Sequence, residues 1–301
     1  MKRILLFCLF LSPIIARPQV LPQQFPYHTN ASYFDFHYKR NVPKITEIAR
    51  FADGFVKLLN RDFFEADFDF PIQVLVLEDQ NQFKQFLVKE LQIDEPPSFG
   101  IYVPNFKLFA TYEDSGLGTF AHEILHPLVE RNLQDRPAWS KEGIPTFFEK
   151  FYGYWKGDDL IVIWGFQNPW RIAQIGTNLT HLNLREIISE PKLSTDFVAV
   201  EREESNLRMA SVFLWNQGRF RRFLKLIAAH DKAGFPSYFE AAMEMPIDKI
   251  QPVWQSYLDE VAKQRTKILS LPVSTICNDE AAFQSFVKVN QISSEQPKQR
   301  E

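Results

Sequence analysis

The sequence has few cysteines, no excess of positive charge and no apolar run long enough to span a membrane. Of the 301 residues, only Cys8 and Cys277 are cysteine. If an N-terminal segment with Cys8 is removed, Cys277 cannot form an internal disulfide, so we expect the core alone to hold the fold. The formal net charge is −3. Nucleic-acid-binding domains carry a basic stripe, so we expect no nucleic-acid partner.

The N-terminus has the pattern of a secretory signal peptide. Lys2 and Arg3 precede a short apolar run over 4–15, which ends at the small residue Ala16. A membrane-spanning helix needs about 20 apolar residues, so this run is too short to be a comfortable span. We therefore expect residues 1–16 to be removed and the mature chain to be secreted or periplasmic, without a transmembrane span. An uncleaved signal would instead anchor the chain to a membrane.

The remaining pattern predicts one α+β domain. The composition, with 45% hydrophobic and 24% charged residues, is typical of a globular protein. Alternating or continuous apolar stretches predict strands at 32–38, at 71–79 and, as a pair, within 98–116, and helical spacing predicts helices at 44–63 and 80–91. After a short strand at 158–165, helices are predicted at 202–217, 218–233, 237–245 and 247–265.

Strands mixed with helices thus come first, and helices nearly alone follow, an order typical of α+β domains. We predict a catalytic domain at 31–270, divided into an upper α/β part at 31–131 and a mainly helical lower part at 132–270. Residues 17–30 are predicted to be a loose N-terminal segment. The polar residues at 271–301 are predicted to be a flexible tail.

A short motif between these two parts indicates metal chemistry. His122, Glu123 and His126 form the pattern H-E-x-x-H. On a helix, the two His residues lie one turn apart on the same face, so both imidazoles can reach one metal ion. Zinc lowers the pKa of a water molecule toward neutrality, and Glu123 beside it can accept the proton. The pattern therefore predicts zinc ligands at His122 and His126 and a general base at Glu123.

A catalytic zinc site needs a third protein ligand and one open position. The longer motif with a third His, H-E-x-x-H-x-x-G-x-x-H, is absent, because Val129 stands at the position of its Gly and Asn132 at the position of its third His. The downstream candidates are Asp135, Glu142, Glu149, His181 and His230. We favour Glu142, because Pro137 can begin a second helix, predicted at 137–152, with Glu142 in its first turns. Glu149 is about two turns further and would share that face, as a supporting residue or as an alternative ligand.

Several segments together resemble the gluzincin metallopeptidases, specifically the peptidase MA-like family. They are "FDFHY", "PIQVLVLEDQNQFKQF", "GIYVP…KLFATY", the H-E-x-x-H helix, "PAWSKEG" and "VWQSYL". The resemblance implies a zincin-like fold with an N-terminal mixed β-sheet, the motif helix and a C-terminal helical subdomain. In this family the Glu of the E-G pair is the third zinc ligand, which corresponds to Glu142. In this fold the strand before the motif helix borders the cleft, so the strand at 105–112 is expected to pair with extended substrates.

The chain departs from the family in two places. Family members often carry a Tyr early in a late helix that helps to hold the oxyanion, whereas residues 202–217 contain no Tyr. Asn206 and Arg208 are the nearest polar residues, and Arg208 is the candidate oxyanion stabiliser because a cation favours developing negative charge. The second departure is Pro145, where Ala is common in the family. Pro145 removes a backbone donor from its predicted helix, as Pro127 does after His126, and both prolines could bend their helices without moving the ligands.

The leading prediction is an exported zinc metallopeptidase that hydrolyses peptide bonds of a peptide or protein substrate. An alternative keeps the fold with weak or no catalysis, as a protein that binds a peptide or a partner protein. A third alternative gives the His pair a structural role without metal. The intact His-Glu-His-Glu set favours catalysis, because a site without catalysis need not keep Glu123, whereas the missing Tyr and the two prolines favour the alternatives.

Overall fold

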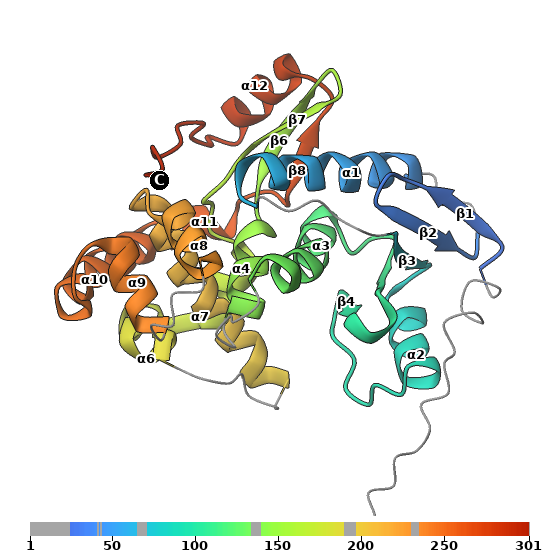
Figure 1. The fold of residues 1–301 in the computed structure, drawn as a ribbon. Coiled ribbons are helices and arrows are strands. Elements are labelled where there is room, and N and C mark those ends of the chain that lie inside the picture. The colour runs from blue at the N-terminus through green and yellow to red at the C-terminus, as the bar shows by residue number, and fades with distance from the viewer. Residues whose placement is uncertain are drawn as a thin grey trace, which may run out of the picture.

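A computed structural model describes residues 25–40, 42, 44–64, 71–133, 140–189, 197–229 and 235–300. The predicted signal peptide, Asp135, Pro137 and His230 lie outside these ranges. Within them, no helix combines the length and apolar character needed to cross a membrane. The fold is α+β, with a mixed N-terminal sheet and a C-terminal part dominated by helices, which confirms the predicted class (Figure 1).

Among the described residues, the N-terminal sheet has five strands in the order β1-β2-β3-β5-β4. Strands β2, β3 and β5 are parallel to one another, whereas β1 pairs antiparallel with β2 and β4 pairs antiparallel with β5. The strands are β1 (Tyr27–Asn30), β2 (Phe34–Tyr38), β3 (Ile72–Leu77), β4 (Gly100–Val103) and β5 (Leu108–Tyr112). Because β5 is already paired with β3 on one side and β4 on the other, the prediction that the strand at 105–112 pairs with extended substrates is wrong. The edge on that side is β4.

Helices cover both faces of this sheet. Helices α1 (Ile45–Asp62) and α3 (Leu117–Asn132) pack on one face, and α2 (Gln80–Glu90) packs on the other. The alternation of a strand explains this division, because successive side chains point to opposite faces. Val74 and Val76 of β3 belong to the core with α1 and α3, whereas Leu75 and Leu77 pack with α2.

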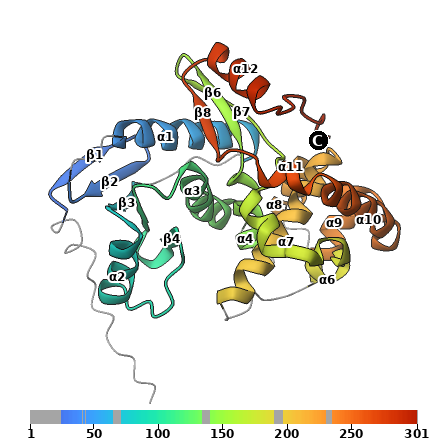
Figure 2. The ribbon, with the colours of Figure 1, turned by 180° about the vertical axis from the view of Figure 1, so that it is seen from behind.

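Helix α3 lies between the sheet and the helical part of the molecule, with α4 (Ser140–Phe148) beside it (Figures 1 and 2). Both helices continue through their internal prolines, Pro127 and Pro145. The predicted helix at 137–152 ends earlier, at Phe148, because Tyr152 begins a strand. The later helices are α5 (Pro169–Ile175), α6 (Leu184–Ser189), α7 (Phe197–Asn216), α8 (Phe220–Ala228), α9 (Phe235–Met243), α10 (Ile247–Lys263) and α11 (Arg265–Leu269), and a 3₁₀ helix, η3, spans Gly176–His181.

The C-terminal residues form part of a second sheet. Strand β6 (Tyr152–Lys156) pairs antiparallel with β7 (Asp159–Ile163) and parallel with β8 (Thr275–Cys277). Helix α12 (Glu280–Val289) then covers this sheet with the buried side chains of Phe283 and Val287. The predictions of a flexible tail at 271–301 and a loose segment at 17–30 are therefore wrong for the described residues, because residues 25–30 also hold β1 and the buried Phe25.

Candidate metal centre

Helix α3 brings His122, Glu123 and His126 together, with His122 and His126 one helical turn apart. Its apolar side packs in the main core through Phe120, Ile124 and Leu128. The two imidazole rings have their centroids 5.0 Å apart. One nitrogen or oxygen atom from each of the three motif residues lies within 4.8 Å of the others. The group is therefore compatible with binding a metal ion.

Helix α4 brings Glu142 to the same point. Its Oε2 lies 3.3 Å from His122 Nε2 and 3.7 Å from His126 Nε2. Glu142 is thus in contact with both imidazoles, whereas Glu123 Oε2 approaches only that of His126, at 3.7 Å. The Nε2 atoms and the Glu142 oxygen come from two packed helices, α3 and α4. The contacts are thus compatible with the prediction of Glu142 as the third ligand, and we call His122, His126 and Glu142 the candidate donor set.

Glu123 has a different environment from Glu142. Its side chain is buried and accepts a hydrogen bond from the backbone of Tyr102 in β4. Gly100 makes this close approach of the edge strand possible, because a Cβ there would lie 2.7 Å from Thr119 Cγ2 and 3.2 Å from Glu123 Cγ. Burial raises the pKa of Glu123 to about 7, in the range that suits a proton acceptor near neutral pH.

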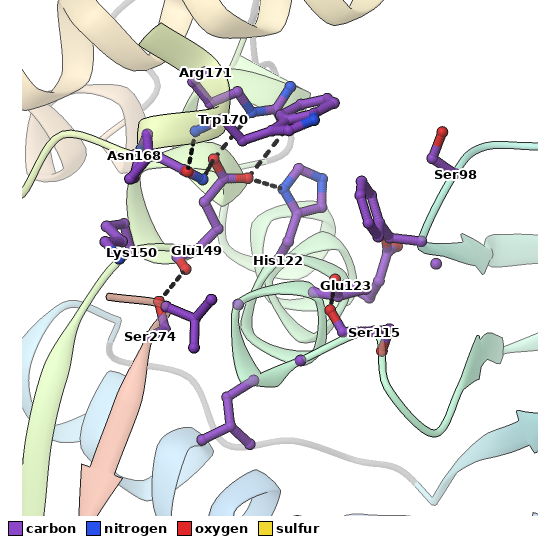
Figure 3. Close-up of a pocket in the computed structure, with 18 of the residues that line it drawn as sticks. Ser98, Ser115, His122, Glu123, Glu149, Lys150, Asn168, Trp170, Arg171 and Ser274 are labelled. Carbon is purple, nitrogen blue, oxygen red and sulfur yellow. Dashed lines mark hydrogen bonds and ion pairs between the residues drawn. The ribbon is translucent and has the colours of Figure 1, made fainter. Parts of the chain in front are cut away.

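Glu149 supports His122 from behind, just after the end of α4. Its Oε2 lies 3.5 Å from His122 Nδ1 (Figure 3), whereas Glu142 contacts the other ring nitrogen, Nε2. Arg171 Nε and Nη2 each donate to this carboxylate at 3.0 Å, and Asn168 Nδ2 donates to it at 2.8 Å. Although burial opposes ionisation, Arg171 holds the pKa of Glu149 well below its usual range. A carboxylate in this position fixes the ring orientation of a ligating His.

The same guanidinium holds a second carboxylate from α7. Arg171 Nη1 donates to Glu204 Oε2 at 2.6 Å. Burial opposes protonation of Arg171, but the two carboxylates raise its pKa above the ordinary value. Burial also raises the pKa of Glu204, against the attraction of Arg171. The three charges therefore form one buried network behind the His122 ring.

The pKa values of His126, His122 and Glu142 reflect burial and the same contacts. Burial lowers the pKa of His126. Burial opposes protonation of His122 as well, but contacts with Glu142 and Glu149 raise its pKa well above the ordinary value. Burial works against ionisation of Glu142, yet the two imidazoles hold the pKa of its carboxyl at about 2. The donor set is therefore strongly coupled to the network through His122.

Arg208 is buried in the structure, with 1% of its surface exposed. Its Nη1 donates to the Phe147 carbonyl at 3.0 Å and its Nη2 donates to the Phe166 carbonyl at 2.6 Å. Nη1 also lies 3.8 Å from Glu149 Oε1. The oxyanion role stays a prediction, but the contacts of Arg208 are those of a group that holds α4 and the Phe166 loop together.

A cavity of about 390 Å³ opens beside His122 and Glu123. The start of α3 forms one wall, and the loop before β4 forms another (Figure 3). The start of α5 and the segment 271–274 complete it. Ser274 Oγ donates to the Glu149 carbonyl at 2.7 Å, and Tyr152 OH donates to the Pro272 carbonyl at 2.9 Å. The C-terminal segment is therefore fastened directly to the residues around the site.

The sequence interpretation missed Arg171, Asn168 and Tyr102. Asn168 followed by Pro169 is a recognisable helix start, and Asn168 Oδ1 does accept from Trp170 N at 3.1 Å. That signal could have located α5, but nothing in the local pattern places Arg171 against Glu149. Tyr102 stacks on His126 at a centroid distance of 6.4 Å and an angle of 9°.

Among the described residues, the sequence candidate His181 does not join the group. His181 is exposed at the end of η3, and Asp135 and His230 lie outside the described residues. Comparison with protein-family models gives no match, and comparison with curated proteins gives none. These comparisons therefore assign no chemistry to this centre.

Proposed function

We propose that this protein is a zinc-dependent metallopeptidase with a zincin-like fold of the gluzincin type. The observation that carries the proposal is the convergence of His122 Nε2, His126 Nε2 and Glu142 Oε2, with contacts of 3.3 and 3.7 Å from the carboxylate to the two rings. Two imidazoles and one carboxylate are a donor set of catalytic zinc, and they leave one coordination position open. The support of His122 Nδ1 by Glu149 is also typical of metal-ligating His residues.

In this proposal the residues around the donor set have separate tasks. Bound zinc would supply the positive charge that polarises a peptide carbonyl and lowers the pKa of water. Glu123 accepts the proton of the attacking water, and the backbone of Tyr102 holds its carboxylate in place. Glu149 orients the His122 ring, and Arg171 fixes Glu149. The buried position of Glu123 limits competing contact with bulk water.

The edge strand β4 offers a place for an extended peptide. It is the last strand of the described sheet, next to β5, and Gly100 at its start lines the cavity beside Glu123. An edge strand presents backbone donors and acceptors to an added strand. A peptide paired with β4 would therefore pass next to the proposed general base.

Zinc content and hydrolysis together test this function. We expect one zinc per chain by elemental analysis, and cleavage of a generic protein substrate that a chelator abolishes and added zinc restores. Glu123→Gln should retain zinc and lose about two to four decades of activity, as for removal of a general base. The control Glu280→Gln, at the exposed start of α12, should change neither property. Wild-type protein that binds no metal would overturn the proposal.

One observation favours the alternative of a peptide-binding protein with little catalysis. The predicted oxyanion group, Arg208, is not among the residues that line the cavity. The two cations that do line it, Lys150 and Arg171, already contact a backbone carbonyl and two carboxylates. If zinc-loaded wild type and Glu123→Gln bind peptides equally and neither cleaves them, this alternative replaces the enzymatic one.

A further inference from the structure

We propose that the cavity beside His122 and Glu123 is an apolar subsite that receives one large aliphatic or aromatic side chain of a peptide. This inference rests on the proposed function, which makes a peptide the ligand. The cavity, at about 390 Å³, is near the lower limit of ligand pockets, which measure roughly 300–1,000 Å³. It therefore has room for one large side chain of a peptide.

Large apolar side chains reach the cavity from every wall. They are Phe99, Leu117, Trp170, Leu271 and Val273. The rings of Phe99 and Trp170 meet edge to face, with centroids 5.8 Å apart and an angle of 87°. Phe99 precedes β4, whereas Trp170 belongs to α5, so this contact joins the sheet part of the molecule to the helical part. The apolar lining is thus assembled from distant segments around one space.

Two of these side chains are exposed although they are apolar. Phe99 is 37% exposed and Val273 is 80% exposed. A single exposed apolar residue is ordinary, but apolar residues that gather at one cavity mark a binding surface. Covering them with an apolar side chain of the ligand removes their surface from water, which favours binding in proportion to the area covered.

The cationic side chains that line the cavity are already paired within the protein, so they do little to favour an anionic ligand. Arg171 is paired with Glu149 and Glu204, and Lys150 donates to the Pro272 carbonyl. Among the described residues, Glu201 forms no ion pair, and it accepts a hydrogen bond from Gln174 Nε2 at 3.5 Å. A basic side chain attracted by Glu201 is therefore the competing ligand, and the experiment must separate it from an apolar one.

A peptide series that varies a single residue tests the subsite. In an otherwise Gly-Ala sequence, that residue is Phe, Leu, Gly, Lys or Asp, and binding to zinc-loaded Glu123→Gln protein is measured by fluorescence anisotropy. We expect the Phe and Leu peptides to bind at least about tenfold more tightly than the Gly peptide, which corresponds to about 1.4 kcal/mol. Equal affinities, or tightest binding of the Lys peptide, would overturn the inference.

A substitution in the cavity lining, compared with a control outside it, shows whether the peptide side chain binds in the cavity. Val273→Lys, made in the same protein, should remove the preference for Phe and Leu and strengthen binding of the Asp peptide. Val289→Lys in α12 is the control, because Val289 is 75% exposed and lies outside the cavity lining; it should leave all affinities unchanged. If Val273→Lys binds the series as its parent does, the side chains bind elsewhere and the inference fails.

Hydrolysis of the same peptides by zinc-loaded wild type separates the two proposals. Preferential binding of Phe and Leu peptides without any cleavage would support the subsite and contradict the proposed peptidase. Cleavage at similar rates across the series, with equal affinities, would support the peptidase and overturn the subsite. Absence of both binding and cleavage would overturn both.

Discussion

The two sides of the His122 ring differ in how their charges are balanced. On the Nδ1 side, the network of Glu149, Arg171 and Glu204 places guanidinium nitrogens 2.6–3.0 Å from carboxylate oxygens. On the Nε2 side, the donor set of His122, His126 and Glu142 has longer contacts of 3.3 and 3.7 Å. The network is thus held by its own charges, and it fixes a ring whose other nitrogen is directed at Glu142.

The strongest test of this difference is to remove the carboxylate of Glu142 from the donor set. Glu142→Ala should abolish stoichiometric zinc binding, because two imidazoles alone fall below the three ligands of a catalytic site. Elemental analysis after dialysis against trace zinc measures the loss, and circular dichroism checks that the variant is folded. If Glu142→Ala keeps one zinc per chain while Glu149→Ala loses it, the third ligand is Glu149 and our assignment is wrong.

Removing the central cation of the network should affect stability more than any exposed ion pair does. Arg171→Met leaves Glu149 and Glu204 without their buried partner, so we expect a loss of about 3–5 kcal/mol in the free energy of unfolding. Arg185→Met is a matched control: its bond to Asp248 is also 2.6 Å, but the two side chains are 57% and 86% exposed. That control should cost at most about 1 kcal/mol. Denaturant unfolding of metal-free protein compares them, and equal losses would contradict the distinction.

A milder change in the network should weaken the donor set without destroying it. Glu149→Gln keeps a similar shape and a hydrogen-bond acceptor near His122 Nδ1 but removes the negative charge. We expect zinc affinity to fall by about 10–100-fold, as for other supporting partners of metal-ligating His residues. Competition with a chelator of known affinity measures the change. An unchanged affinity would show that His122 does not depend on this contact for its orientation.

The smallest effect is expected for Lys150, whose ionisation should make the stability of the fold depend on pH. Burial lowers its pKa to about 7, so the folded chain releases this proton well before the unfolded chain, whose Lys pKa is about 10.4. Between these values the unfolded state binds more protons, and stability rises with pH by up to about 1.4 kcal/mol per unit. The stability of wild type relative to Lys150→Met should therefore increase from pH 7 to pH 9. A constant difference over that range would contradict a buried, depressed amine.

Local sequence patterns were sufficient to predict much of the secondary structure of the N-terminal part. The alternation in 32–38 and the apolar run in 71–79 predicted β2 and β3, and helical spacing predicted α1 and α2. The motif also placed His122 and His126 correctly on one helix face, because that relation depends only on the helical repeat. Glu142 could be proposed from its position after a helix start, and the structure brings it to both rings.

Contacts between segments that are distant in the sequence could not be predicted from local patterns. β8 has only three residues, and its pairing with β6 joins positions more than 100 residues apart, such as Tyr152 and Thr275. Polar composition therefore indicated a loose tail, although Phe283 and Val287 bury themselves against the sheet. Likewise, periodicity could not show that β5 is enclosed by β3 and β4, since an interior and an edge strand can have similar sequences.

The attachment of Ser274 to the Glu149 carbonyl has a consequence for the order of biosynthesis. A ribosome makes the motif helix about 150 residues before it makes Ser274, so a nascent chain holds every proposed metal-binding side chain while one cavity wall is still missing. The wall closes only when residues 271–277 leave the exit tunnel and β8 joins β6. Recognition of a ligand by the complete cavity is thereby restricted to chains whose synthesis is almost finished.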